Sequence, residues 1–324
     1  LIQYIRHNII QVRTWKREIV KVGVNLINFG PGANPKALKS WVQLVEGLGY
    51  HLIMTSDHIA MTPDVQSRYP APFYEPISTL GWLSGITEQI QIGTTVIILP
   101  YRNVIETARA CANIDQLSNG RFILGVGIGW AEQEFQALGV NYSKRGAITN
   151  EYLEALHLLW EQDRASFEGQ FVSFTDIDTA PRPIQTPTPP IWVGGPSDAA
   201  LKRAVLWGDA WHPIRIRTDW LRDTGIPHLK EIAERENRPV PDLCPRIRLY
   251  ITDQPLPNDK RVAGEGDLDQ IHHDLAELEE LGCPYVVLDN YFDDPEAMRR
   301  HESSWRMLSQ VAETIIDLPN QTVR

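Results

Sequence analysis

The feature that most constrains the fold is a regular alternation of short apolar runs with longer amphipathic stretches, from Val22 to the C-terminus. The short runs have strand length, and the longer stretches have helical periodicity. The predicted strands are 22–28, 51–55, 90–99, 120–130, 191–193, 209–212, 247–252 and 285–289. Eight strand–helix units without a change of composition predict one closed, eight-stranded parallel (β/α)8 TIM barrel, with a doubly wound open sheet as the alternative.

The expected helices follow the strands along the chain. They are 36–49, 75–87, 103–118, 146–161, 198–207, 218–236, 267–281 and 294–316. Between the fourth and fifth strands, 164–189 reads as a small β-hairpin and then an extended PRPIQTPTPP run, in which proline forbids helix. We interpret this segment as an insertion, within a single domain of residues 19–324 that follows an N-terminal extension of residues 1–18.

Composition excludes several classes of protein. The formal net charge is −10 and no long basic run occurs, which argues against a nucleic-acid surface. No apolar run reaches the roughly 20 residues of a membrane span, and the N-terminus lacks the apolar core of a signal peptide. Three cysteines without a CxxC motif fit a reducing compartment, so we expect a cytoplasmic protein. The absence of HxH and HExxH motifs predicts no metal site.

In a barrel of this kind the active site lies where the strands end, at their C-terminal edge. His58 follows the second strand and is the best candidate for moving protons, while the adjacent Asp57 would orient it or hold the loop. A histidine bonded to backbone at a strand end is the structural alternative. His212 ends the sixth strand and is expected to line the pocket rather than to act in catalysis.

Two strand ends are rich in glycine. In GRFILGVGIGW, at 120–130, Gly125, Gly127 and Gly129 share one face, which permits either a flat ligand or tight packing. In IWVGGPSDAA, at 191–200, a strand leads through two glycines into a helix capped by a serine, which suits an anion site or an ordinary capped helix. Three tryptophans would form aromatic walls, although the second can also face the helix layer; they are Trp130, Trp192 and Trp211.

Four motifs carry a resemblance to a known family: SDHI at 56–59, IQIGTTVIILPYRN at 90–103, DQLSNGRFILGVGIGWAEQEFQALG at 115–139 and PPIWVGGPSDAALKRA at 189–204. In order and spacing they resemble the bacterial luciferase-like monooxygenase superfamily, and within it the flavin- or deazaflavin-dependent oxidoreductases. The resemblance runs from about Val22 to Pro213 and continues more weakly to the C-terminus. It implies the barrel fold already expected from the alternation.

The resemblance also implies roles for individual residues. His58 takes the place of the active-site histidine beside the reacting ring, and Thr95–Val96 matches a non-proline cis peptide that supports the back of that ring. The implied cofactor-binding residues are Asn28, Thr95, Val96, Gly127, Gly129, Trp130, Gly194, Gly195 and Ser197. Glu134 and Arg145 belong to the pattern of the deazaflavin subgroup, either with a direct role or as an ion pair on a helix surface.

Two departures from the family pattern bear on the cofactor. Pro196 has no N–H to donate where relatives usually carry a residue that does, so the phosphate cradle loses a contact or is rebuilt. Ile128 stands where some flavin-binding members have an arginine. Coenzyme F420 is therefore the preferred cofactor, with FMN as the alternative.

The expected function is that of an oxidoreductase, which transfers hydride or activates oxygen on a small, apolar organic substrate. The pocket for that substrate is expected from the loop 59–74 with Tyr69, Phe73 and Tyr74, from the insertion, and from Trp211 and His212. Family habit suggests a homodimer. Two alternatives stay open: a non-redox lyase or isomerase acting on a phosphorylated metabolite, and a flavin-binding protein without catalysis.

Overall fold

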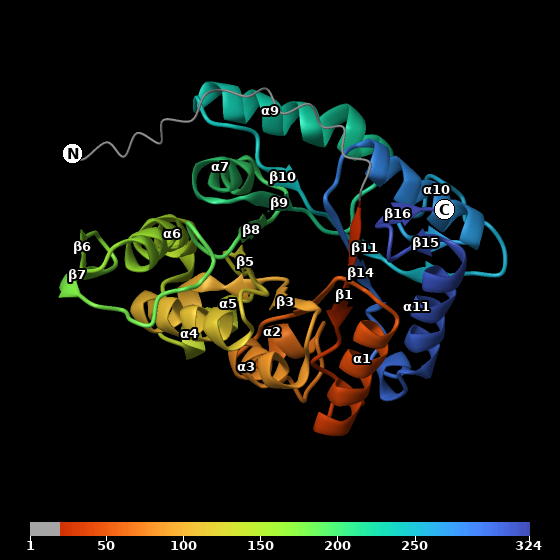
Figure 1. The fold of residues 1–324 in the computed structure, drawn as a ribbon, viewed down its shortest axis with the longest axis horizontal. Helices are drawn as coiled ribbons and strands as arrows, with labels where there is room; N and C mark the ends of the chain where they lie inside the picture. Colours follow the sequence, from red (N-terminus) through yellow and green to blue (C-terminus); the bar gives the residue numbers. More distant parts are fainter. Residues whose placement is uncertain (1–19) are drawn as a thin grey trace.

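A curled sheet of parallel strands forms the centre of the molecule, and helices surround it (Figure 1). The structure is a computed structural model that describes residues 20–324, so the predicted extension 1–18 lies outside the described residues. The strands of this sheet are β1 (Lys21–Leu26), β2 (Leu52–Thr55), β3 (Gln91–Thr94), β4 (Ile97–Ile98), β5 (Phe122–Gly127), β8 (Ile191–Gly194), β9 (Ala210–His212), β10 (Asp242–Leu243), β11 (Arg246–Arg248) and β14 (Tyr285–Asp289). Their order is β10-β9-β8-β5-β3-β2-β1-β14-β11, and β4 also pairs with β5.

The sheet closes through β10 and β11, which are two halves of one strand position. β10 pairs with β9, whereas β11 pairs with β14, so the two ends of the strand order meet at this position. Hydrogen bonds continue across the two intervening residues: Cys244 N–H donates to the Trp211 carbonyl, and the Pro245 carbonyl accepts from Val287 N–H, both at 2.9 Å. The predicted barrel is therefore confirmed. The seventh strand begins at Asp242, earlier than the predicted 247, because pairing continues on either side of the proline.

The main helices lie outside the barrel; all but the last connect barrel strands, and α11 follows the final barrel strand, β14. They are α1 (Pro35–Gly47), α3 (Pro76–Ile86), α4 (Val104–Leu117), α6 (Arg145–Glu161), α7 (Asp198–Trp207), α9 (Ile226–Arg235), α10 (Leu268–Glu280) and α11 (Glu302–Thr314). Local signals explain their starts: Asn34 caps α1 ahead of a proline at the first turn, and Asp267 begins α10 with a capping box. The predicted 218–236 helix is divided by a π-helical turn, Leu221–Gly225, between α8 (Thr218–Trp220) and α9.

Smaller elements complete the described chain. The predicted hairpin is present as β6 (Ala165–Glu168) and β7 (Ser173–Ile177), which pair antiparallel. The short helices α2 (Pro63–Gln66) and α5 (Glu132–Ala137) lie where loops were expected. The remaining strands are β12 (Tyr250–Ile251), β13 (Glu265–Gly266), β15 (Ile316–Asp317) and β16 (Thr322–Val323). Within residues 20–324, no helix is long and apolar enough to span a bilayer.

The barrel interior has an apolar layer with polar groups above it. The apolar layer consists of Leu52, Met54, Ile123, Trp192, Ala210, Cys244 and Val287. Side chains alternate along each strand, so on β9 Ala210 and His212 face inward while Trp211 packs in the outer core between sheet and helices. Trp192 thus faces the barrel interior and not the helix layer. Toward the C-terminal strand ends, the inward residues become polar.

Candidate active site

A buried histidine–glutamate pair lies at the C-terminal end of β2. His58 Nδ1 is 2.6 Å from Glu134 Oε2, and the two side chains are 5% and 0% exposed. The same carboxylate accepts hydrogen bonds from the Tyr101 hydroxyl and from the backbone N–H groups of Ile59 and Ala60. Because a carboxylate only accepts, Nδ1 of His58 carries a proton and Nε2 is the nitrogen left to exchange one.

Glu134 is held in its charged form by these contacts. Burial acts to raise the pKa of Glu134, but the hydrogen bonds from His58 and from two backbone N–H groups outweigh it, so the pKa lies below its ordinary value. The glutamate comes from α5, the short helix that follows β5. Sequence reasoning noted Glu134 as part of a family pattern, but it did not predict the bond to His58.

The alternative of a surface ion pair between Glu134 and Arg145 is wrong. Glu134 is fully buried against the loop that follows β2. The guanidinium of Arg145 stacks over the ring of Tyr142, 3.9 Å from its centroid, and donates to the Tyr142 carbonyl at 3.0 Å. Glu134 and Arg145 therefore have different partners: Glu134 binds the loop after β2, and Arg145 binds Tyr142.

Aromatic rings enclose His58. The imidazole lies 5.2 Å from the ring of Tyr69, 5.5 Å from that of Phe73 and 5.7 Å from that of Trp130, measured between centroids. Arg68 lies over the Trp130 ring at 4.7 Å. The structure thus brings together four residues that the sequence placed at this site, from the ends of β2 and β5 and the loop 59–74. Such a surrounding shields the imidazole from water on these sides.

Asp57 holds the loop instead of orienting His58. Its carboxylate accepts two hydrogen bonds from the Arg102 guanidinium, at 2.7 and 2.8 Å, and one from the Ile98 N–H at 2.7 Å. Arg102 also pairs with Glu75. Asp57 was expected either to orient His58 or to hold the loop. The structure favours the role in holding the loop, because Glu134 is the carboxylate that orients the imidazole. The catalytic role assigned to Asp57 on sequence is corrected accordingly.

The implied non-proline cis peptide is present between Thr95 and Val96, at the break between β3 and β4. The Thr95 hydroxyl is 2.8 Å from Nε2 of His212, and Arg246 donates to the Thr95 carbonyl at 2.8 Å. Burial lowers the pKa of His212 to about 4, so the ring is neutral. His212 Nδ1 donates to the Cys244 carbonyl, which leaves Nε2 to accept from the Thr95 hydroxyl.

The glycines of the fourth-strand exit are packed closely by the protein itself. A Cβ atom on Gly127 would lie 2.6 Å from a methyl carbon of Val96, and one on Gly129 would lie 2.7 Å from Ile98. Gly129 also has a φ of +76°, which favours glycine. Tight packing therefore accounts for the missing side chains, and whether this backbone also borders a cofactor stays a prediction.

The glycine exit of β8 leads into α7 as expected. Ser197 caps α7 by accepting from the Ala200 N–H at 3.3 Å, and Gly195 has a φ of +114°. Asp198, the first residue of the helix, pairs with His228 at 3.0 Å. An acidic side chain at a helix N-terminus competes with any phosphate for the same N–H groups. Anion binding by Gly194, Gly195 and Ser197 stays a prediction.

From the sequence, Asn28 was expected to bind the cofactor, and Tyr74 and Trp211 were expected to line the substrate pocket. The Asn28 amide donates to the carbonyls of Ser56 and Tyr74, at 2.9 and 2.7 Å, so it ties the end of β1 to the loop 59–74. Trp211 is fully buried outside the barrel, where its indole N–H donates to the Gly195 carbonyl. It cannot line the substrate pocket, because strand alternation directs it away from the interior; that expectation was wrong.

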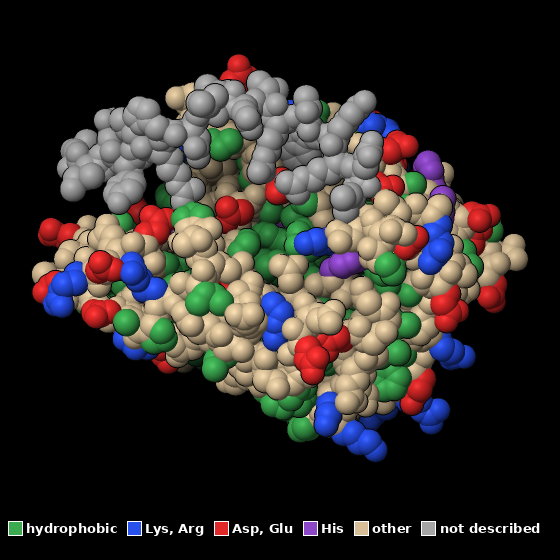
Figure 2. All heavy atoms as spheres, viewed as in Figure 1, with side chains coloured by type: hydrophobic (Ala, Val, Ile, Leu, Met, Phe, Trp, Pro, Cys, Tyr) green, Lys and Arg blue, Asp and Glu red, His purple; other side chains and the backbone are tan. Residues whose placement is uncertain are grey.

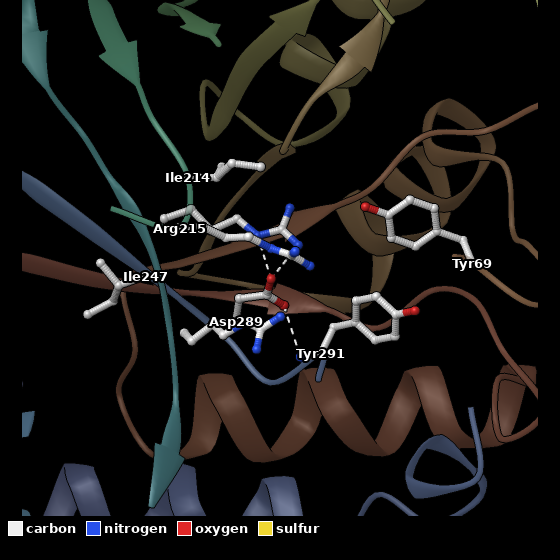
Figure 3. A pocket seen from close by; sticks show the side chains of 8 residues that line it. Tyr69, Ile214, Arg215, Ile247, Asp289 and Tyr291 are labelled. Atoms are coloured by element: carbon white, nitrogen blue, oxygen red, sulfur yellow. Dashed lines mark hydrogen bonds and ion pairs between the residues drawn. The ribbon is translucent and has the colours of Figure 1, made fainter. Parts of the chain in front are cut away.

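A pocket opens beside this site, between the C-terminal ends of β9, β11 and β14 (Figure 3). It is lined by Tyr69, Ile214, Arg215, Arg246, Ile247, Arg248, Asp289 and Tyr291. The face shown in Figure 2 is hollowed near its centre, with hydrophobic side chains at the bottom. Of these eight lining residues, only Tyr69 was expected from the sequence to line a pocket, and the other residues expected there, Phe73, Tyr74, Trp211 and His212, are not among them. The charged alternation of RIR at 246–248 was the available signal, and it was missed because the predicted strand begins at 247.

Comparison with known proteins decides the family. The model of the luciferase-like monooxygenase family matches residues 21–283. The chain belongs to the luciferase-like monooxygenase family. Among its relatives in that family is the F420-dependent glucose-6-phosphate dehydrogenase of Amycolatopsis mediterranei, 30% identical over 230 residues, which cover 67% of this chain and 65% of the relative.

A second relative uses a different cofactor. The FMNH2-dependent dimethylsulfone monooxygenase of Pseudomonas putida is 33% identical over 142 residues, 43% of this chain and 39% of that protein. Among solved structures, an F420-dependent secondary alcohol dehydrogenase with an F420–acetone adduct matches with a TM-score of 0.72 and 17% identity, over 87% of this chain and 96% of that one. This structural likeness shows the shared fold. The family thus includes both F420- and FMN-dependent oxidoreductases.

Proposed function

We propose that the protein is an F420-dependent oxidoreductase that acts on a small organic substrate, with FMN as the alternative cofactor. The observation that carries the proposal is the buried His58–Glu134 pair at the C-terminal end of β2. When bound, a reduced deazaflavin supplies a hydride, whereas a reduced flavin activates oxygen. The protein would hold a proton at Nδ1 of His58 and offer Nε2 for proton transfer to the substrate or the ring.

The residues around the cis peptide fit the ring of such a cofactor. Thr95 and Val96 form a bulge at the mouth of the barrel, and His212 and Arg246 fix Thr95 through its hydroxyl and carbonyl. Val96 is in turn held against Gly127. A platform supported on both sides can hold a flat ring in one position, which is what hydride transfer requires.

The N-terminus of α7, where the cofactor's phosphate was expected, fits an anion less well. Pro196 and Asp198 weaken the N-terminus of α7 as an anion site. Two cations lie on α6 and α7: Arg145, whose Nε is buried without a hydrogen-bond partner, and Arg203, which is 6% exposed and donates to Asn150 and to the Gly146 carbonyl. Burial and the charge of Arg145 lower the pKa of Arg203. An anionic group between the two would relieve this repulsion, so we propose that the tail is held by these arginines together with Ser197.

The choice of F420 over FMN rests on Ile128. This residue lies in the fourth-strand exit, where some flavin-binding members have an arginine for the phosphate, and isoleucine offers no charge there. The F420-dependent relative, aligned over two thirds of the chain, is consistent with this choice. The FMNH2-dependent relative, aligned over a shorter part, keeps FMN as the alternative.

Cofactor titration tests the proposal. We expect oxidised F420 to bind the purified full chain with a change in its absorption spectrum, and FMN to bind more weakly. His58→Ala should leave F420 binding unchanged while lowering turnover across a substrate panel by ~10²–10⁴-fold. His273→Ala, at an exposed position on α10, is the matched control and should change neither. Binding of neither cofactor would reject the proposal and favour a non-redox barrel enzyme.

A further inference from the structure

The pocket at the mouth of the barrel is rich in arginine. Three guanidinium groups line it, from Arg215, Arg246 and Arg248, against one lining carboxylate, Asp289. In Figure 3 the carboxylate of Asp289 points into the space that the rings of Tyr69 and Tyr291 border from the other side. The pocket therefore combines cationic groups with an aromatic wall, and Tyr69 connects it to His58, since their rings lie 5.2 Å apart.

One of the three arginines is fully engaged in holding the site. Arg246 donates to Asp289 at 2.6 and 2.9 Å and to the Thr95 carbonyl at 2.8 Å. Asp289 also accepts from the Asn25 amide at 2.8 Å. The two side chains are only 11% and 13% exposed. This pair is a fixed floor for the pocket and leaves the other two arginines to receive a ligand.

Arg215 and Arg248 share a single carboxylate at the rim. Both Asp293 oxygens accept from Arg215 at 2.8 Å, and one of them also accepts from Arg248 at 2.6 Å. Arg248 has a second partner in Glu265, whereas among the described residues Arg215 pairs with Asp293 alone. In addition, Nε of Arg248 is buried without a hydrogen-bond partner. Removing Asp293 from this position would leave one uncompensated positive charge facing the pocket.

The backbone at this rim is unusual. Arg215 has a φ of +52° and Asp293 a φ of +58°, in the left-handed region that side-chain-bearing residues seldom adopt. Such conformations persist where the surroundings impose them, and they concentrate at ligand-binding sites. The pair is about half exposed, at 48% and 44%, and exposed ion pairs are weak in water. Asp293 can therefore be displaced by a competing carboxylate at little cost.

We propose that the substrate is an organic carboxylate with an apolar body, whose carboxylate takes the place of Asp293 on Arg215 and Arg248. The body would lie against Tyr69 and Tyr291, within reach of His58. Guanidinium groups are well matched to carboxylates, and Nη2 of Arg215 already donates to both oxygens of Asp293. That this carboxylate is a substrate rests on the proposed oxidoreductase function, whereas the anion site does not depend on it. The apolar substrate expected from the sequence thereby gains a charged end.

Calorimetric titration of the full chain with benzoate and with benzamide, its uncharged analogue, tests this proposal. Benzoate should bind at least tenfold more tightly than benzamide in a buffer of low ionic strength. Arg215→Gln and Arg248→Gln should each remove most of that preference. Asp293→Asn, which removes the competing carboxylate, should strengthen benzoate binding by about threefold to fivefold and leave benzamide unchanged. Glu296→Gln, which breaks a comparable exposed pair with Arg299, is the control and should alter neither ligand.

The sign of the Asp293→Asn effect separates this proposal from a structural role. If Asp293 only stabilised the rim, its replacement would weaken benzoate binding or leave it unchanged, and either result would overturn the proposal. Equal binding of benzoate and benzamide by the natural chain would also overturn it, without any variant. Failure of F420 and FMN to bind would instead reject the oxidoreductase function, while a benzoate preference would still establish the anion site.

Discussion

The buried His212 predicts a specific dependence of stability on pH. Burial lowers its pKa to about 4 in the folded protein, whereas an unfolded histidine titrates near pH 6.5. Between these values the unfolded chain binds a proton that the folded chain does not, so stability falls as pH decreases through this window. From pH 7 to pH 5 the loss attributable to His212 is about 2 kcal/mol, because each pH unit inside the window costs ~1.4 kcal/mol.

The assay is thermal unfolding of the natural chain and of His212→Asn at pH 7, 6 and 5. Asparagine can still donate to the Cys244 carbonyl but does not titrate, so the variant should lose about 3 °C less in Tm between pH 7 and 5 than the natural chain does. His228→Asn is the control with the opposite sign. Asp198 raises the pKa of His228, so its contribution to stability is present at low pH and lost as pH rises.

Parallel curves of Tm against pH for the natural chain and His212→Asn would refute this reasoning. They would mean that folded His212 takes up its proton at about the same pH as an unfolded histidine, near pH 6.5, and is therefore charged at pH 5. In that case Nε2 would be a donor and could not accept from the Thr95 hydroxyl, so the support described for the cis peptide would also be wrong. The measurement thus tests the geometry of the cofactor platform without requiring a known substrate.

Three further predictions concern other parts of the site. Glu134→Gln should lower turnover by ~10²–10⁴-fold without weakening cofactor binding. The amide N–H₂ group of glutamine would face Nδ1 of His58 and donate to it, so the imidazole proton would move to Nε2. Nitrogen NMR of the imidazole reports that change of tautomer. Gly127→Ala should cost ~1–3 kcal/mol in urea unfolding, since its Cβ would meet Val96, whereas Gly47→Ala, with open space around it, should cost nothing. The expected homodimer stays a prediction: light-scattering chromatography of the purified protein should give twice the 36.8 kDa mass of one chain, and the mass of a single chain would reject it.

The barrel could be predicted because residues close together in the sequence indicate each of its strands and helices. Each strand and each long helix has its own apolar period and its own turn or cap residues, and eight repeats leave few alternatives. The seventh strand was misplaced for a local reason as well. Pro245 interrupts its apolar pattern, and sequence alone does not show that pairing continues on either side, with β9 before the proline and β14 after it.

The partners within the site could not be predicted in the same way. His58 was recognised from its place after a strand, but Glu134 is 76 residues away on a helix of six residues, too short for periodicity to indicate a buried face. Arg246 and Asp289 meet only because β11 and β14 pair in one register. The orientation of Trp211 depends on strand parity, and a shift of one residue exchanges inside for outside.

The glycines of the fourth-strand exit show that packing and ligand binding are not exclusive alternatives. Gly127 lacks a side chain because Val96 occupies that space, and Val96 follows the cis peptide that shapes the bulge. If the cofactor ring lies on this bulge, as we propose, the glycine contributes by allowing the bulge to form, without touching the ring. Gly127→Ala should then weaken F420 binding together with stability, whereas a glycine that served packing alone would lose stability with cofactor affinity unchanged.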